Sequence, residues 1–300
     1  MTLTGLASPS AATPTENPVK RQHAILLGAY EKFKSTNTSH NDNFTIKSNI
    51  VEDNASGEVY GLLPYSLSTI RKLLESPAEW CKATILHINI KTCTVESDQQ
   101  EHPLVTLYVA DEDYKEPEFA EKIAYRYIPK SMSDQYVHLV LDSKSGPMDS
   151  GNYNIDISGI AVGPNQTFVH LNYSMQIGFF ARAVLKTYLA TLGRSKVGFT
   201  EVGQGVVKKG ESTEPKFIGG IEGVMERNTM RYYFAFDAYL SSLNEATDSQ
   251  FTSALNHWFD YTEKYRRQLY ELDRNVYLQR KTRERQNQIA LQAKISTVNN

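Results

Sequence analysis

Six consecutive segments in the middle of the chain alternate apolar and polar residues with a period of two. They cover residues 84–94, 104–109, 121–128, 136–142, 152–160 and 167–175. In the last segment Val169, Leu171 and Tyr173 share one face, and His170 and Asn172 share the other. Such alternation is typical of antiparallel strands that bury one face and expose the other. We therefore expect a curved antiparallel meander that is covered on one side.

The chain before this meander predicts one more strand and several short helices. Residues 19–34 have an amphipathic helical pattern, and residues 44–63 read as a long strand interrupted at the turn signal 52–57. Short helical segments follow at 66–76, where Ser66 or Ser68 can be the N-cap, and at 77–82, which Pro77 opens. The expected sheet then has about seven strands.

Beyond residue 176 the hydrophobic period changes to that of helices. Three helices are expected, over 177–192, over 222–243 and from Ser249 onward, with a Gly-rich hairpin or loop at 196–219. The last helix carries a heptad seam of Phe251, Leu255, Trp258, Thr262, Tyr265, Leu269, Leu272 and Val276. Such a seam packs lengthwise on a partner helix. The charged stretch 280–288 is expected to fray or project into solvent. The fold class is thus α+β.

This element order resembles the START-like, helix-grip superfamily. The resemblance covers residues 44–192, and residues 56–91 look like a START-like opening, in which a strand leads into a helix and then into a turn before Trp80. Separately, residues 80–91, 196–203 and 226–240 resemble an uncharacterised bacterial family of exported START-like proteins. It implies a sheet gripping a C-terminal helix, with a hydrophobic cavity between them. It leaves open which of the three C-terminal helices closes the sheet. The expected organisation is a tail at 1–20, a START-like domain at 21–245, and a long helix with a frayed end at 246–300.

Candidate ligand contacts follow from this expected cavity. Tyr125, Tyr127, Tyr153 and Tyr173 fall on the inward parity of their strands, where they either line a cavity or fill a core. Arg227 and Arg231 lie four residues apart in a helix that is otherwise apolar. They either bind an anionic headgroup or pair with carboxylates inside the protein.

Polar residues of the strands give no catalytic or metal site. His87, His138 and His170 lie on the polar parity of separate strands, as expected for solvated outer-face side chains. The row of His87, Asn89 and Lys91 is either part of that solvated face or a polar floor beneath the C-terminal helices. No nucleophile motif or acid–base pair emerges, so we expect no metal, no cofactor and no catalytic activity.

Composition bears on partners and on compartment. A net charge of -2 and the absence of a long apolar run argue against nucleic acid and against a membrane-spanning segment. Residues 3–12 resemble the end of a secretory signal, and Cys81 and Cys93 are spaced so that a disulfide is possible. We therefore expect an exported, periplasmic protein. The alternative is a cytoplasmic chain with a flexible tail and two free thiols.

Two functions remain open from the sequence. The first is non-catalytic binding of a hydrophobic or amphipathic, lipid-like molecule between sheet and helix. The second is an interaction or scaffold protein with a filled core, which self-associates or binds a partner through the heptad helix.

Overall fold

An eight-stranded antiparallel sheet forms the centre of the computed structural model, which describes residues 18–36, 43–96, 101–191, 195–204 and 215–298. The strands are β1 (Phe44–Val51), β2 (Asn54–Leu63), β3 (Ile90–Glu96), β4 (Leu104–Val109), β5 (Glu121–Met132), β6 (Tyr136–Ser145), β7 (Gly151–Gly163) and β8 (Gln166–Gln176). Their order across the sheet is β1-β2-β8-β7-β6-β5-β4-β3. This sheet and its helices confirm the α+β prediction.

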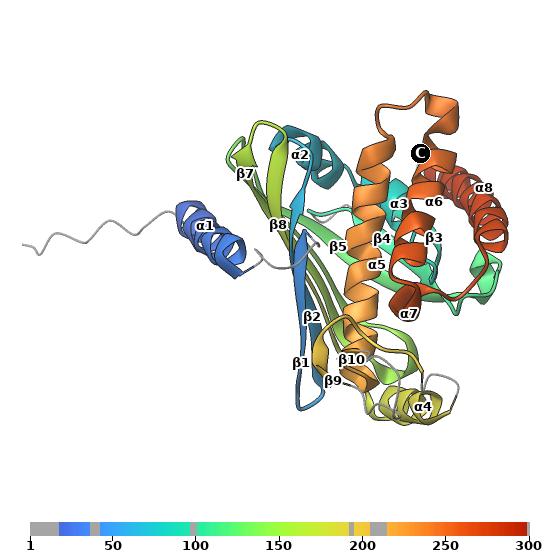
Figure 1. Ribbon diagram of the computed structural model, residues 1–300. Coiled ribbons are helices and arrows are strands. Elements are labelled where there is room, and N and C mark those ends of the chain that lie inside the picture. The colour runs from blue at the N-terminus through green and yellow to red at the C-terminus, as the bar shows by residue number, and fades with distance from the viewer. Residues whose placement is uncertain (1–17, 37–42, 97–100, 192–194, 205–214, 299–300) are drawn as a thin grey trace, which may run out of the picture.

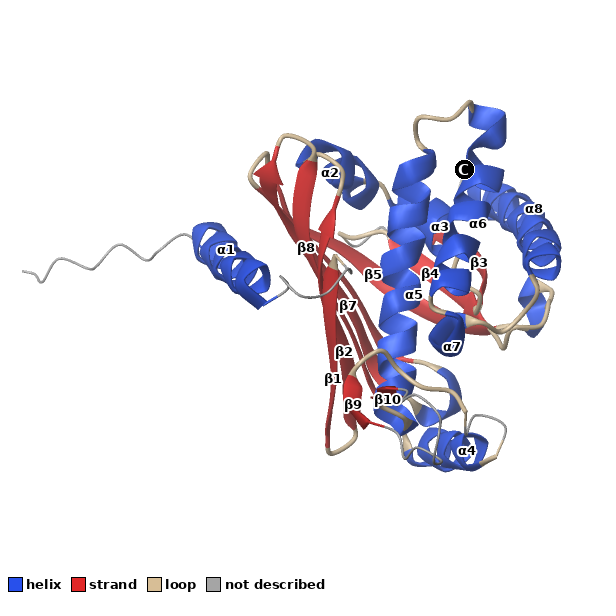
Figure 2. Ribbon diagram, viewed as in Figure 1, coloured by secondary structure: helices blue, strands red, loops and turns tan. Residues whose placement is uncertain are grey.

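Most helices lie on one face of the sheet, and α1 lies on the other face (Figure 1 and Figure 2). The helices are α1 (Pro18–Thr36), α2 (Leu67–Glu75), α3 (Pro77–Thr84), α4 (Phe179–Ala190), α5 (Gly220–Ser242), α6 (Thr247–Lys264), α7 (Arg266–Leu269) and α8 (Arg274–Val298). Helix α5 lies on the inner face of the sheet, and α6 and α8 lie beyond it, whereas α1 lies on the opposite side of the sheet. Short 3-10 turns at Pro117–Phe119 (η2) and Pro147–Asp149 (η3), and a small hairpin of β9 (Glu201–Gln204) and β10 (Pro215–Phe217), complete the described elements.

Two strand boundaries differ from the sequence prediction. The segment 44–63 is a hairpin of two paired strands, turned at Glu52 with a φ of 56°, so the sheet has eight strands where about seven were expected. The strand expected from residue 84 begins only at Ile90. Thr84 still belongs to α3, and its hydroxyl donates to the carbonyl of Trp80. The apolar alternation of residues 85–89 belongs to a buried turn.

Helix α5 closes the sheet, and two glycines of β2 lie at the positions of closest approach. A Cβ atom on Gly57 would lie 2.3 Å from the Thr229 hydroxyl oxygen, and one on Gly61 would lie 2.2 Å from the Tyr233 hydroxyl oxygen. The side chains of Thr229 and Tyr233, and the Met225 backbone beside Gly57, therefore approach this strand more closely than Cβ atoms at the two glycines would permit. The question of which C-terminal helix closes the sheet is thus decided in favour of α5.

The single long helix expected over 246–300 is wrong. The chain leaves helical geometry at Tyr265, whose φ and ψ are -110° and 48°, and again after Leu269, so the segment forms α6, α7 and α8. The seam residues Leu255, Trp258 and Leu269 are buried in the same core as the sheet. The heptad pattern therefore reflects packing inside this chain. The two breaks around α7 change the chain direction, so that α8 packs back against the domain.

Helix α8 covers the free edge of β3, the last strand of the sheet. The Gln292 amide accepts a hydrogen bond from the Val95 backbone N–H at 2.8 Å and donates to its carbonyl at 2.9 Å, as a neighbouring strand would. Lys281 donates to the carbonyls of His87 and Ile90, both at 2.8 Å. The expectation that residues 280–288 fray in solvent is therefore wrong, because their polar side chains satisfy an exposed strand edge.

Gln288 ties the same helix to the two cysteines. Cys81 and Cys93 form a disulfide with their Cα atoms 5.2 Å apart, which links α3 to β3. The Gln288 amide donates to the carbonyl of Cys81 at 3.2 Å and to that of Cys93 at 2.9 Å. One side chain of α8 thus contacts two neighbouring segments, α3 and β3, that lie 207 and 195 residues earlier in the chain.

The N-terminal helix forms a separate small core on the outer face of the sheet. Leu26 and Phe33 of α1 pack against Tyr136, Ile160 and Phe168. Residues 18–20, expected to belong to the tail, are the first residues of this helix, and residues 1–17 lie outside the described ranges. Within those ranges, no helix combines the length and apolar character of a bilayer span.

We predict that Gln288→Leu lowers the free energy of unfolding by about 1–2 kcal/mol, because two buried carbonyls lose a donor. Urea denaturation would measure the change. Gln286→Leu is the matched control, since Gln286 is exposed two residues away on the same helix, and its effect should stay within about 0.5 kcal/mol. Equal stabilities of the two variants would contradict the docking of α8 described above.

Candidate ligand cavity

A cavity of about 430 Å³ lies between the inner face of the sheet and helices α4 and α5. Its apolar lining consists of Val109, Ile123, Pro147, Met148, Met175, Ile177, Ala181, Val184, Leu185, Val224 and Met225. Its polar lining consists of His87, Asn89, Tyr125, Ser150, Tyr153, Tyr173, Asn228 and Tyr232. No described residue that lines it carries a charge at neutral pH. The space suits a molecule that is mostly apolar and bears a few hydrogen-bonding groups.

Three of the four predicted tyrosines line this cavity. The rings of Tyr125 and Tyr153 lie 6.4 Å apart, and the ring of Tyr173 lies 5.7 Å from that of Tyr232. Burial is the main cause that raises the pKa of each of these four hydroxyls above its ordinary value, so all four stay neutral near pH 7. Tyr127 is instead a core residue, and its hydroxyl donates to the Leu74 carbonyl at 2.8 Å.

One end of the cavity is polar, and its hydrogen bonds have a fixed direction. The Nδ1 atom of His87 accepts the backbone N–H of Asn89 at 3.1 Å, so the single proton of the neutral ring lies on Nε2. That Nε2–H donates to Oδ1 of Asn228 at 2.9 Å. The Nδ2 group of Asn228 is left as a donor on the side that borders the cavity and Tyr173, with whose hydroxyl it interacts.

The electrostatic surroundings keep His87 neutral. Burial lowers the pKa of this imidazole well below its ordinary value, and the positive charges of Arg231, Lys281 and Lys91 lower it further. His87 is therefore not the solvated outer-face side chain expected from the strand pattern. With Asn89 and Lys91, it forms the polar floor beneath the C-terminal helices, the second of the two interpretations that the sequence allowed.

Arg227 and Arg231 lie behind this polar end and do not line the cavity. Both guanidinium groups pair with Oε1 of Glu271, Arg231 at 2.8 Å, and Lys196 pairs with Oε2 of the same carboxylate. Arg231 also donates to Oδ1 of Asn89 at 3.0 Å. The arginines are thus paired inside the protein, with a carboxylate on the segment after α7 that sequence spacing did not single out.

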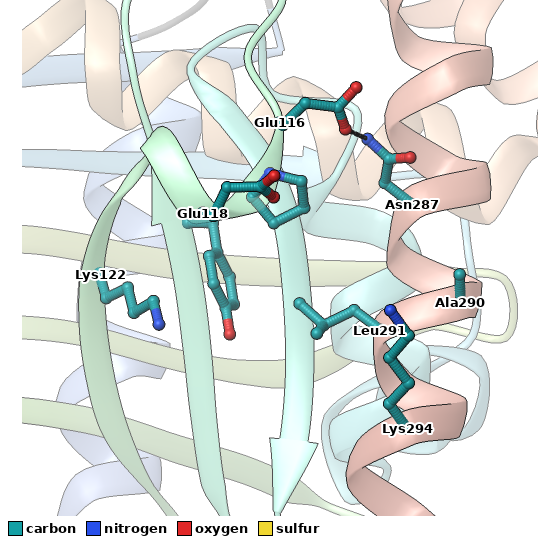
Figure 3. A pocket seen from close by; sticks show the side chains of 9 residues that line it. Glu116, Glu118, Lys122, Asn287, Ala290, Leu291 and Lys294 are labelled. Atoms are coloured by element: carbon teal, nitrogen blue, oxygen red, sulfur yellow. Dashed lines mark hydrogen bonds between the residues drawn. The ribbon is translucent and has the colours of Figure 1, made fainter.

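Two other hollows lie at the surface. One of about 270 Å³, shown in Figure 3, lies between α8 and the start of β5, where Asn287 donates to Glu116 at 2.8 Å and where Lys122 and Lys294 also lie. Another, of about 420 Å³, separates α1 from β1 and β2. Both are bordered by charged side chains, such as Lys294 in the first and Lys47 in the second, so neither has the uncharged, mostly apolar lining of the central cavity.

The remaining predicted histidines each lie near one carboxylate, on neighbouring strands. His138 lies 3.1 Å from the Asp156 carboxylate, and His170 lies 3.9 Å from that of Glu58, both on the outer face of the sheet. Among the described residues, no three His, Cys, Asp or Glu side chains converge as a metal site would require.

Sequence reasoning missed Asn228 and Tyr232 as cavity residues. Both lie on α5, at positions i and i+4, and this spacing marks one face of a helix. The helix is apolar on nearly all sides, so its pattern alone does not say which face borders the cavity.

We predict that Glu271→Gln lowers the free energy of unfolding by about 3 kcal/mol, because it leaves Arg227 and Arg231 buried without a carboxylate. Denaturation in urea near pH 7 would measure this. Glu263→Gln is the control, since Glu263 forms an exposed pair with Arg266 that should contribute less than about 0.5 kcal/mol. A loss no larger than that of the control would contradict the buried pairing.

The lowered pKa of Glu271 makes the free energy of unfolding depend on pH. Burial alone would raise the pKa of Glu271, but Arg231, Arg227 and Lys196 outweigh it and lower that pKa below 4.5. A lowered pKa in the folded state gives stability that is present above pH 4.5 and is lost as the pH falls through the folded-state value. Acid unfolding of wild type should therefore be steeper than that of Glu271→Gln. If stability falls with pH equally in wild type and in Glu271→Gln, the lowered pKa of Glu271 is contradicted.

The chain matches no family model and no curated protein. Among solved structures, it is similar to a conserved protein of unknown function from Enterococcus faecalis, at 10% identity and a TM-score of 0.35, covering 78% of this chain and 96% of that one. Human StAR-related lipid transfer protein 5 is 8% identical, with a TM-score of 0.32 and coverage of 57% and 89%. The Zhui aromatase/cyclase from a Streptomyces species is also 8% identical, with a TM-score of 0.32 and coverage of 70% and 94%. Likeness at this level transfers neither a ligand nor an activity to this chain.

Proposed function

We propose that this protein binds a hydrophobic or amphipathic small molecule in the cavity between the sheet and α5, without transforming it. The observation that carries the proposal is the lining itself, in which an apolar wall is interrupted by four neutral tyrosine hydroxyls and one polar end. A volume of about 430 Å³ lies within the range of small-molecule sites and is larger than packing defects in a filled core.

Access to the cavity is supported at the side formed by α4 and η3. Met148 of η3 and Val184 of α4 both border the cavity, yet they are 57% and 54% exposed. Side chains that reach both the interior and the solvent mark the mouth. A ligand entering there would meet apolar groups first and the polar end formed by His87 and Asn228 afterwards.

The alternative function, a scaffold that uses the heptad helix, has no observation in its favour. The seam is interrupted by the turns around α7, and its large members Leu255 and Trp258 are each only 1% exposed inside this chain. A partner helix would need these same surfaces.

We predict that Val224→Trp weakens binding by filling the cavity from α5, where Val224 is half-buried. The uncharged fluorophore N-phenyl-1-naphthylamine should bind wild type and should bind the variant at least about tenfold more weakly. Val202→Trp is the matched control, because Val202 is 51% exposed on β9 away from the cavity. Unchanged affinity in a folded Val224→Trp protein would contradict the location of the site.

The proposal extends to the compartment: the protein works outside the reducing cytoplasm, as an exported protein. The Cys81–Cys93 disulfide supports this, because such bonds persist in oxidising compartments. Protein isolated from its source without reductant should have an intact mass lower by two hydrogens than the same sample reduced under denaturing conditions. Two free thiols in the isolated protein would favour the cytoplasmic alternative.

A further inference from the structure

The charges behind the polar end of the cavity do not balance. Lys91 and Lys281 share one carboxylate, that of Glu284, and all three side chains are at most 2% exposed. Among the described residues, Arg227, Arg231 and Lys196 likewise share one carboxylate, that of Glu271. Five cationic groups thus stand against two carboxylates. Exposed Asp111 and Glu112 add negative charge from the solvent side, where water and salt screen it.

This excess charge is in contact with the residues that line the cavity. Lys281 donates to the His87 carbonyl at 2.8 Å, and Arg231 donates to the Asn89 side chain at 3.0 Å. Arg231, Lys281 and Lys91 each act on the His87 ring with a positive charge, which adds to the effect of burial in lowering its pKa. Glu226, the buried carboxylate on the same helix, is bound elsewhere, by the backbone N–H groups of Phe199 and Thr200. The polar end therefore has a positive potential in a low-dielectric setting.

The hydrogen-bond donor at the polar end, the Asn228 amide, suits a negative ligand atom, as the positive potential does. His87 holds Oδ1 of Asn228, so the Nδ2 group of that amide lies on the cavity side, beside the Tyr173 hydroxyl with which one of its N–H groups interacts. The described lining contains no carboxylate that would repel a negative ligand atom. We propose that the polar end, where Asn228 meets His87 and Asn89, takes an oxyanion, so that the preferred ligand is an amphiphile with a single carboxylate. This inference rests on the proposed binding function and adds the chemistry of the ligand's head.

The test compares two ligands with the same chain, decanoate and 1-decanol, as competitors that displace N-phenyl-1-naphthylamine at pH 7. The alcohol keeps the apolar chain and one hydroxyl but lacks the negative charge. We expect decanoate to bind wild type at least about tenfold more tightly than decanol, because only the carboxylate gains from the buried cations. Decanol binding as tightly as decanoate would overturn the oxyanion site and leave the binding function intact. If the fluorophore and both competitors fail to bind, the binding function itself is wrong.

A substitution at the donor tests the location. Asn228→Asp keeps the oxygen that His87 binds but replaces the Nδ2 donor with a second, negatively charged oxygen. Decanoate affinity should fall at least about tenfold, while decanol affinity stays within about threefold. Asn256→Asp is the matched control, since it adds the same charge on α6 beside Arg274. Unchanged decanoate affinity in a folded Asn228→Asp protein would overturn the assignment, and should that variant not fold, the two-ligand comparison on wild type still decides.

Discussion

The burial of helix α5 on nearly all sides is the constraint on which the rest of this structure depends. Most residues between Met225 and Leu240 are buried, so the helix needs a packing partner on every face. The sheet supplies one side, with glycines at the positions of closest approach, and α6 and α3 supply others. The C-terminal segment cannot be an independent appendage, because removing it would expose one side of the central helix.

The same burial dictates how the charges of α5 are satisfied. Four charged residues between Met225 and Leu240 find partners outside this helix: the two arginines on Glu271, Glu226 on residues 199–200, and Asp237 on the hydroxyls of Tyr65 and Tyr261. Burial raises the pKa of Asp237 despite those two donors. These contacts fix the rotation of the helix about its axis, since any other rotation would leave a buried charge without a partner.

The cavity follows from where α5 touches the sheet. The helix packs on β1, β2 and β8, whereas the sheet wall of the cavity comes from β4, β5, β7 and the last residues of β8. Inward side chains such as Tyr125 and Tyr153 therefore border the cavity, because α5 packs on other strands. Helix α4 and η3 form the remaining side of the cavity. A filled core would need larger side chains at Ala181 or Val224. The chain instead has small ones there.

The sequence by itself determined the antiparallel sheet, because alternation with period two specifies which face each strand buries. It also determined the positions of the helices at 222–243 and 177–192, the inward parity of Tyr125, Tyr153 and Tyr173, and the possibility of a Cys81–Cys93 bridge. These features are local, since spacing along one segment is enough to define a face. The continuous heptad seam was misleading because burial inside one chain and pairing with a second helix select the same spacing.

Only the tertiary structure decided which helix closes the sheet, where Glu271 and Glu284 lie, and that a cavity remains. Each of these depends on contacts between segments more than forty residues apart, such as Glu271 with Arg227 or Lys281 with His87. A charged stretch such as 280–288 looks solvated in sequence because its own composition says nothing about the strand edge that it covers. The physical reason is that desolvation and pairing are properties of the assembled surroundings, and a one-dimensional pattern does not contain them.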